Sequence, residues 1–174
     1  MKRFLSLFVS VLFVVGAWSQ NTENGHEYVD LGLPSKTLWA TTNIGADGPE
    51  KFGSYFAWGE IERKDDYRWR TYLWMNHSIN SEEGCNKYTF ADNQTNCSWY
   101  NSDEVFIGDN KKELDSDDDV AAIIWGGNWR IPSLEQQQEL LSNCYWVWTT
   151  IYDSNKVNGY IVFKAKRESD KGVI

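Results

Sequence analysis

The stretch Trp125-Gly126-Gly127-Asn128-Trp129-Arg130-Ile131-Pro132-Ser133 runs directly into Leu-Glu-Gln-Gln-Gln-Glu-Leu-Leu at residues 134–141. Two glycines between tryptophans predict a backbone that turns sharply beside bulky rings. A strand-like Trp-Arg-Ile is stopped by proline, and a helix follows in which Ser133 and Gln136 form a capping box. Three leucines are expected on the inner face of this helix: Leu134, Leu140 and Leu141. The stretch is typical of a fold signature rather than of a catalytic site.

The N-terminus predicts export from the cytoplasm. Lys2 and Arg3 precede an apolar run at residues 4–15, and Ala17-Trp18-Ser19 offers small residues at the positions that a signal peptidase reads. We therefore expect a signal peptide at residues 1–19 and a mature chain beginning at Gln20, located in the secreted, cell-surface or periplasmic space. The apolar run is short for a membrane span, so none is expected after cleavage.

Composition limits the classes of partner. Loss of Lys2 and Arg3 with the leader changes the formal net charge from −8 to −10. Nucleic acid is a poor partner for such a chain, because phosphate binding requires clustered Lys and Arg. The length suits one domain at residues 27–174 after a polar lead at residues 20–26. The ten tryptophans indicate a packed domain rather than disorder.

Cysteine and histidine give no sign of a metal or redox centre. Cys85, Cys97 and Cys144 are an odd set for an oxidising compartment. Cys85 and Cys97 share one polar loop and could form a disulfide there, an alternative that the sequence leaves open. CxxC spacing does not occur, so neither thiol redox chemistry nor a structural zinc site is supported. His26 and His77 lack a metal-binding context, and we expect surface histidines, with no metal and no cofactor.

Alternation of apolar and polar residues predicts short strands at both ends of the chain. Residues 27–31 and 37–42 predict two strands around a turn, and Tyr55–Gly59 predicts a third. Residues 145–152 and 157–164 predict a β-hairpin with a loop at residues 153–156.

Between these elements, residues 60–112 show no sustained periodicity and predict a long loop-rich insertion. Its aromatic residues have two interpretations: rings that hold the loop on the core, or a surface that binds a glycan or a surface protein. The candidate ligand-binding residues are Trp69, Trp74, Trp99 and Tyr100.

An acidic run at residues 115–119 has two interpretations as well. Several carboxylates suit calcium, yet an EF-hand loop would need glycine at its sixth position and glutamate at its twelfth, where Val120 and Gly126 stand. The alternative is a short helix from Val120, in which Ser116 is the N-cap and Asp119 completes a capping box. We expect the helix cap and no metal.

The chain resembles the Fibrobacter succinogenes major paralogous domain family in several separated motifs, at residues 26–35, 37–40, 43–46, 55–60 and 125–132. The resemblance implies a C-type-lectin-like α+β fold, with short antiparallel strands and two short helices, in secreted and surface proteins of gut bacteria of the Bacteroidetes type. It carries no established activity. Nine residues make up the fold signature: Trp39, Trp58, Gly59, Trp125, Gly126, Gly127, Trp129, Arg130 and Pro132.

Three departures from the family pattern affect what it implies. Gln137 stands where members carry an aromatic or apolar residue, which would weaken the inner face of the helix. Thr42 stands where many members have cysteine, which bears on the pairing of Cys144. Members continue through further strands, whereas this sequence ends at Ile174. We therefore expect a domain that lacks its C-terminal strands, with marginal stability and self-association.

The expected function is that of a secreted or surface-exposed binding or adhesion module. A truncated structural paralogue without a ligand is the alternative. An enzyme of the formylglycine-generating type is less favoured, because the three cysteines do not lie in its motifs. Neither a Ser/His/Asp arrangement nor a phosphate-binding glycine loop occurs, and the sugar-binding motifs of calcium-dependent lectins are absent.

Overall fold

The computed structural model describes residues 21–76, 78, 82–91 and 97–165 of the chain. The expected signal peptide and His77 lie outside these residues. Small antiparallel sheets combine with two helices, which confirms the α+β class. The elements are, in chain order, β1 (Thr22–Glu23), β2 (His26–Val29), β3 (Trp39–Ala40), the 3-10 turns η1 (Trp69–Thr71) and η2 (Glu82–Gly84), α1 (Val120–Trp125), α2 (Leu134–Asn143), β4 (Cys144–Tyr152) and β5 (Asn155–Ala165).

Strands β1, β2 and β3 form a three-stranded antiparallel sheet in that order. Asn24 and Gly25 join β1 to β2 with φ angles of 51° and 81°, which a two-residue hairpin turn requires. The polar lead expected at residues 20–26 thus contains a short strand, since this Asn-Gly turn pairs Thr22 and Glu23 with β2. Beyond β2 the chain leaves the sheet, and Leu31 and Leu33 turn into the core.

Helix α1 begins where the acidic run ends, but its cap differs from the prediction. Asp119 is the N-cap, and its Oδ1 accepts hydrogen bonds from the amides of Ala121 at 2.8 Å and Ala122 at 3.2 Å. Its second oxygen accepts from the amide of Ile131 at 2.8 Å. Ser116 is exposed. Its predicted role as the cap is wrong, because only Asp119 also reaches the chain that returns after the helix.

Helix α2 has the predicted capping box, in which Ser133 accepts from the Gln136 amide while the Gln136 side chain accepts from the Ser133 amide. Leu140 packs against the core as predicted. Leu134 and Leu141 do not, since they are 62% and 60% exposed. The predicted inner face of α2 is therefore too wide, because the small core contacts only one side of the helix.

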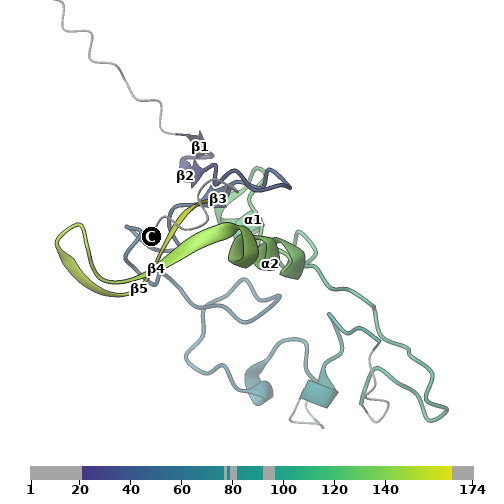
Figure 1. Cartoon of the computed structure of the whole chain (residues 1–174). Helices are drawn as coiled ribbons and strands as arrows, with labels where there is room; N and C mark the ends of the chain where they lie inside the picture. Colours follow the sequence, from purple (N-terminus) through teal and green to yellow (C-terminus); the bar gives the residue numbers. More distant parts are fainter. Residues whose placement is uncertain (1–20, 77, 79–81, 92–96, 166–174) are drawn as a thin grey trace, which may run out of the picture.

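Strands β4 and β5 form the predicted antiparallel hairpin. Asp153 and Ser154 make a two-residue turn with φ angles of 44° and 66°. The loop is thus shorter than the predicted 153–156, and Asn155 and Lys156 belong to β5. The hairpin projects from one side of the body formed by the small sheet and the helices (Figure 1).

The core is a cluster of Leu31, Leu33 and Cys144, and Cys144 is fully buried. The partly buried residues packed against it are Trp39, Leu140, Trp146 and Val162. Gln137 is not a defect in this core, contrary to expectation. It is exposed, and its Nε2 donates to the carbonyl of Pro132 at 3.3 Å.

The strand expected at Tyr55–Gly59 is not formed. The amide of Glu60 donates to the carbonyl of Ala57 at 3.0 Å, which closes a turn at Trp58 and Gly59. Gly59 has a φ of 72°, a conformation that interrupts an extended segment. The alternation in this segment therefore reflects a turn with one buried side rather than a strand.

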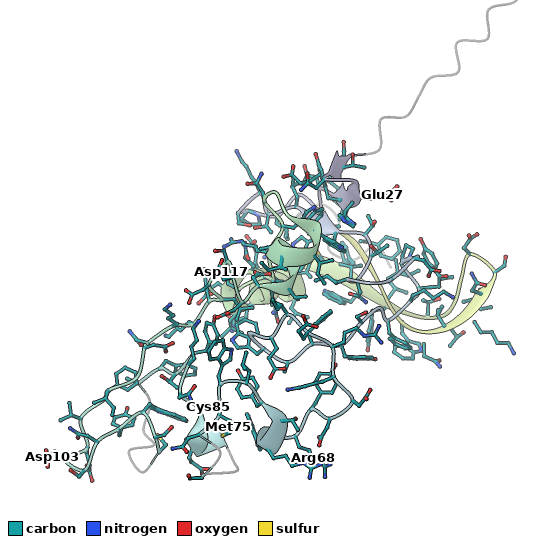
Figure 2. All side chains as sticks on the ribbon, turned by 180° about the vertical axis from the view of Figure 1, so that it is seen from behind. Glu27, Arg68, Met75, Cys85, Asp103 and Asp117 are labelled. Carbon is teal, nitrogen blue, oxygen red and sulfur yellow. The ribbon has the colours of Figure 1, made fainter. Side chains whose placement is uncertain are left out.

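The insertion at residues 60–112 is loop-rich, as predicted. In its described part the only helical turns are η1 and η2. Isolated bridges pair Met75 with Cys85 and Tyr100 with Phe106. Figure 2 shows Arg68, Met75, Cys85 and Asp103 far from Glu27, with Asp117 between them beside the helices. The insertion thus extends away from the small sheet.

Candidate functional site

An open cavity of about 910 Å³ lies between the small sheet, the turn at Trp58 and Gly59, and the segment after α1. Most of the predicted fold signature lines it: Trp39, Trp58, Gly59, Trp125, Trp129, Arg130 and Pro132. Residues distant in sequence and identified as a fold signature therefore share one concave surface, which we call the aromatic cavity.

The wall of the cavity after α1 is fixed by the first hairpin. Gly126 and Gly127 have φ angles of 67° and 61°. A Cβ on Gly127 would lie 2.7 Å from Glu23 Oε1, the end of a flexible side chain, so glycine is favoured there mainly by its positive φ. Asn24 Nδ2 donates to the carbonyl of Trp125 at 2.9 Å, and Trp129 Nε1 donates to the carbonyl of Glu23 at 2.8 Å.

Contacts between aromatic rings also stabilise this wall of the cavity. The His26 ring stacks on Trp125 with a centroid distance of 4.2 Å, and Trp129 meets Trp125 edge-on at 5.0 Å. His26 is therefore a packing residue rather than the surface histidine that we expected. Trp125 is 9% exposed, so this wall is a rigid support.

The opposite wall is the turn at Gly59, which connects the cavity to the insertion. Tyr72 Oη donates to the carbonyl of Trp58 at 2.8 Å, and Trp74 Nε1 donates to that of Gly59 at 2.9 Å. Burial raises the pKa of the Tyr72 phenol, which stays a donor. Glu60 is buried and accepts from Lys64 Nζ at 2.6 Å and from the Leu73 amide at 2.9 Å.

A charged cluster attaches the insertion to the acidic run. Lys87 Nζ pairs with the carboxylates of Asp118 and Asp115, the latter at 3.0 Å, and lies 4.5 Å from the centroid of the Trp74 ring. Tyr88 Oη also donates to Asp118. Burial alone would raise the pKa of the Asp118 carboxyl. Hydrogen bonds from Lys87 and Tyr88 lower this pKa by more, so that the net shift is downward.

This cluster predicts an acid-sensitive attachment of the insertion. Because the folded-state pKa of Asp118 lies below its unfolded value of about 3.9, the pairing stabilises the fold above that pH and is lost as the pH falls through the folded pKa. We expect the loss of unfolding free energy caused by Asp118→Asn to be constant above about pH 5 and to shrink below about pH 4. Denaturant unfolding at a series of pH values measures this loss.

The control is the same pair of measurements in a Lys87→Met background, that is, Lys87→Met alone and Lys87→Met combined with Asp118→Asn. Without the ammonium, Asp118→Asn should show a much weaker pH dependence. An unchanged pH dependence in the Lys87→Met background would contradict the role of the Lys87–Asp118 pair.

The acidic run is used in packing. Asp119 caps α1, Asp118 and Asp115 bind Lys87, and Asp115 also accepts from Lys111 Nζ at 2.6 Å. Among the described residues, no group of three or more His, Cys, Asp or Glu side chains could hold a metal ion.

The four predicted ligand-binding rings have different surroundings. Trp74 packs against Tyr88 and the Gly59 turn, and the indole nitrogen of Trp99 is buried. Tyr100 contacts Phe106 at 5.5 Å within the outer part of the insertion. Trp69 is 42% exposed and meets Tyr72 edge-on. None of the four lines the aromatic cavity.

The structure contains no disulfide bond among its described cysteines. The segments that carry Cys85 and Cys97 nevertheless lie side by side, since Ser98 Oγ donates to the carbonyl of Cys85 at 2.5 Å. The Ser98 amide also donates to the carbonyl of Glu83 at 2.6 Å. The disulfide left open by the sequence is absent from this structure.

Two rings at the mouth of the cavity, Phe52 and Tyr55, were not identified from the sequence. Phe52 and Tyr55 line it and are 72% and 66% exposed, and Trp58 is 41% exposed. The signal was present, since residues 52–58 contain four large rings and follow a segment rich in turn residues. Alternation of apolar and polar residues at Tyr55–Gly59 predicted a strand there, and not the rim of a cavity.

Polar groups between the rings complete the chemistry of the cavity. The lining includes residues with polar and charged side chains: Asn43, Asn128, Gln136, Arg130, Glu23, Glu60 and Asp118. Trp39 also lines the cavity, and its buried indole N–H has no partner within the described part of the chain. Flat apolar faces beside polar side chains suit a ligand that is itself both apolar-faced and rich in hydroxyl or amide groups.

Within residues 21–76, 78, 82–91 and 97–165, helices are too short to span a bilayer. Comparisons of the chain with family models, curated proteins and solved structures found no match in any of the three.

Proposed function

We propose that the chain is an exported binding module that takes a saccharide in the aromatic cavity. The observation that carries this proposal is the set of three exposed rings, Phe52, Tyr55 and Trp58, on the rim of a cavity of about 910 Å³. Exposed rings suit the apolar faces of sugars, and amide side chains supply hydrogen bonds to hydroxyl groups.

The sequence supports the same proposal from two further sides. The leader-like N-terminus favours export to the medium or the cell surface, where glycans are available. The resemblance to the Fibrobacter succinogenes major paralogous domain family favours a C-type-lectin-like arrangement of the α+β elements. A shared fold is only an analogy for function, so the argument for binding depends on the rim and not on the family.

A structural paralogue without a ligand is the second candidate. It is favoured by the apolar side chains left exposed away from the cavity, such as Leu134 and Leu141. On this alternative the cavity is unused space and its rim rings have no partner. The two candidates differ in whether removal of a rim ring changes binding.

Trp58→Ala provides the test, with Trp69→Ala as the matched control. The two tryptophans are 41% and 42% exposed, and each meets one tyrosine edge-on, at 6.5 Å for Trp58 and 5.9 Å for Trp69. Only Trp58 lines the aromatic cavity. We expect Trp58→Ala to weaken binding of the best oligosaccharide on a glycan array by about 2 kcal/mol, roughly thirtyfold in Kd.

Trp69→Ala should leave that Kd within about twofold, because a surface ring outside the contact contributes little. Calorimetric titration with the selected oligosaccharide measures both variants, and thermal unfolding shows whether they lose similar stability. Equal loss of affinity in the two variants, or retention of full affinity in Trp58→Ala, would be evidence against the cavity as the site. Failure of every glycan to bind would favour the structural paralogue.

A further inference from the structure

We propose that Arg130 determines the specificity of the aromatic cavity, in which its guanidinium pairs with the carboxylate of a uronic-acid saccharide. This role rests on the saccharide site proposed above and specifies the class of sugar that binds there. The support comes from the hydrogen bonds of the charged residues in the lining, from the fixed segment that carries Arg130 and from the aromatic rim of the same cavity.

Arg130 is the charged lining residue whose hydrogen-bonding capacity is unused. The cavity lining contains four charged residues: Glu23, Glu60, Asp118 and Arg130. A guanidinium carries five N–H donors. Within the described part of the chain, that of Arg130 makes no hydrogen bond, and its one ion pair, with Glu113 Oε2, has an N–O distance of 3.8 Å. Both side chains of this pair are more than half exposed, so a ligand can displace Glu113 at little cost.

The three carboxylates of the lining already have partners. Two of them form ion pairs with lysines of the protein: Glu60 with Lys64, and Asp118 with Lys87. The third, Glu23, accepts at Oε1 from the amide of Asn128 at 3.1 Å and from its Nδ2 at 3.0 Å. Acidic residues elsewhere in the chain are screened beyond about 8 Å at physiological ionic strength. Arg130 is therefore the lining charge that a ligand can pair most readily, which favours an anionic ligand over a cationic one.

The segment that carries Arg130 is fixed on both sides. Trp129 Nε1 donates to the carbonyl of Glu23 at 2.8 Å, and the amide of Ile131 donates to Asp119 Oδ2 at 2.8 Å. The backbone at Arg130 therefore has a defined position beside the cavity, and little ordering of the chain is needed when a ligand binds. The side chain is 54% exposed, so a ligand can reach it from solvent.

The rim and the guanidinium together suit a sugar that carries a carboxylate. The planar fork of a guanidinium matches a carboxylate through two parallel N–H···O bonds. A uronic acid adds this group to a ring whose apolar face can stack on an aromatic side chain. Arg130 lines the same cavity as the rim rings Phe52, Tyr55 and Trp58. A uronic-acid oligosaccharide thus offers a partner to the rings and to the cation, whereas a neutral one leaves the guanidinium without an anion.

A glycan array that pairs uronic-acid oligosaccharides with their carboxyl-reduced forms tests the role of Arg130, followed by calorimetric titration of the purified chain with the best pair. We expect the acidic form to bind about tenfold more tightly, because the reduced form cannot make charge-assisted hydrogen bonds. Arg130→Gln should abolish this preference and leave the Kd of the reduced form within about twofold. Arg130→Lys keeps the charge but not the fork and should retain part of the preference.

Arg70→Gln is the matched control. The Arg70 side chain is 56% exposed, against 54% for Arg130, and it does not line the cavity. Its replacement removes the same charge from the chain and should leave the preference for the acidic form unchanged. Glu113→Gln should instead strengthen binding of the acidic form about twofold, because the carboxylate that competes for Arg130 is removed.

The possible outcomes separate the role of Arg130 from the saccharide site itself. Equal binding of the acidic and reduced forms would overturn that role, as would a preference that Arg130→Gln leaves intact or that Arg70→Gln removes equally. A preference for sulfated over uronic-acid oligosaccharides would also overturn it. In each of these cases the cavity stays the binding site if Trp58→Ala weakens both forms. Absence of binding by every glycan would refute the saccharide site and the role of Arg130 together.

Discussion

Replacement of Gly59 with alanine is expected to lower the free energy of unfolding by about 3 kcal/mol, the sum of a backbone and a packing effect. Gly59 has a φ of 72°, which costs an L-residue free energy whatever surrounds it. In addition, the new Cβ would lie 2.6 Å from Tyr88 Cε2 and 3.0 Å from Trp74 Nε1. Both rings are held in place, Trp74 by the Gly59 carbonyl itself and Tyr88 by Asp118, so neither can yield cheaply.

Gly25→Ala separates the two effects. Gly25 has a similar φ of 81°, but a Cβ there meets nothing within 4 Å. Its replacement should therefore cost only the backbone effect, about 1 kcal/mol. Denaturant unfolding of the two variants gives the difference directly. Equal losses in both would show that Gly59 does not support the rings of the insertion.

The second large effect is expected at Asp119. Asp119→Ala removes the acceptor of three backbone amides, those of Ala121, Ala122 and Ile131, at a side chain that is 4% exposed. Loss of a helix cap together with a buried unpaired amide should cost about 3 kcal/mol in unfolding free energy. Asp119→Asn keeps one acceptor oxygen and should fall between the wild type and the alanine variant.

Ser116→Ala is the control, because Ser116 is the residue that sequence reasoning selects as the cap. It is exposed, and its replacement should change the unfolding free energy by no more than about 0.5 kcal/mol. Thermal unfolding of the two alanine variants decides between the caps. A larger effect at Ser116 than at Asp119 would show that α1 begins one turn earlier than the structure has it.

The sequence predicted elements whose structure depends on near neighbours. The capping box of Ser133 and Gln136 is confirmed because both partners lie within one helical turn. The hairpin from β4 to β5 is confirmed because alternation and a short polar turn are local as well. Where two caps were locally adequate, at Ser116 and Asp119, a contact with the distant Ile131 decided between them. Such a contact has no local signal.

The site was harder to predict than the fold. Trp39, Trp58 and Trp125 were identified as parts of a signature, yet nothing in their spacing indicated that they would surround one cavity. The rings chosen as ligand contacts were chosen because they stand in polar sequence. Trp74 shows that a tryptophan in a polar loop can also hold that loop to the core through its N–H and its ring face.

One carboxylate also determines where the insertion can change in length. Asp109 accepts the amides of Tyr88 and Thr89, each at 2.9 Å, so the chain leaves and returns through the same point. Residues added or removed between Phe90 and Gly108 leave this closure and the aromatic cavity in place. Closing a longer loop is inexpensive, since each doubling of its length costs only about 0.6 kcal/mol. As related sequences diverge, length variation is expected to concentrate in this excursion, so that copies differing in reach keep the same core.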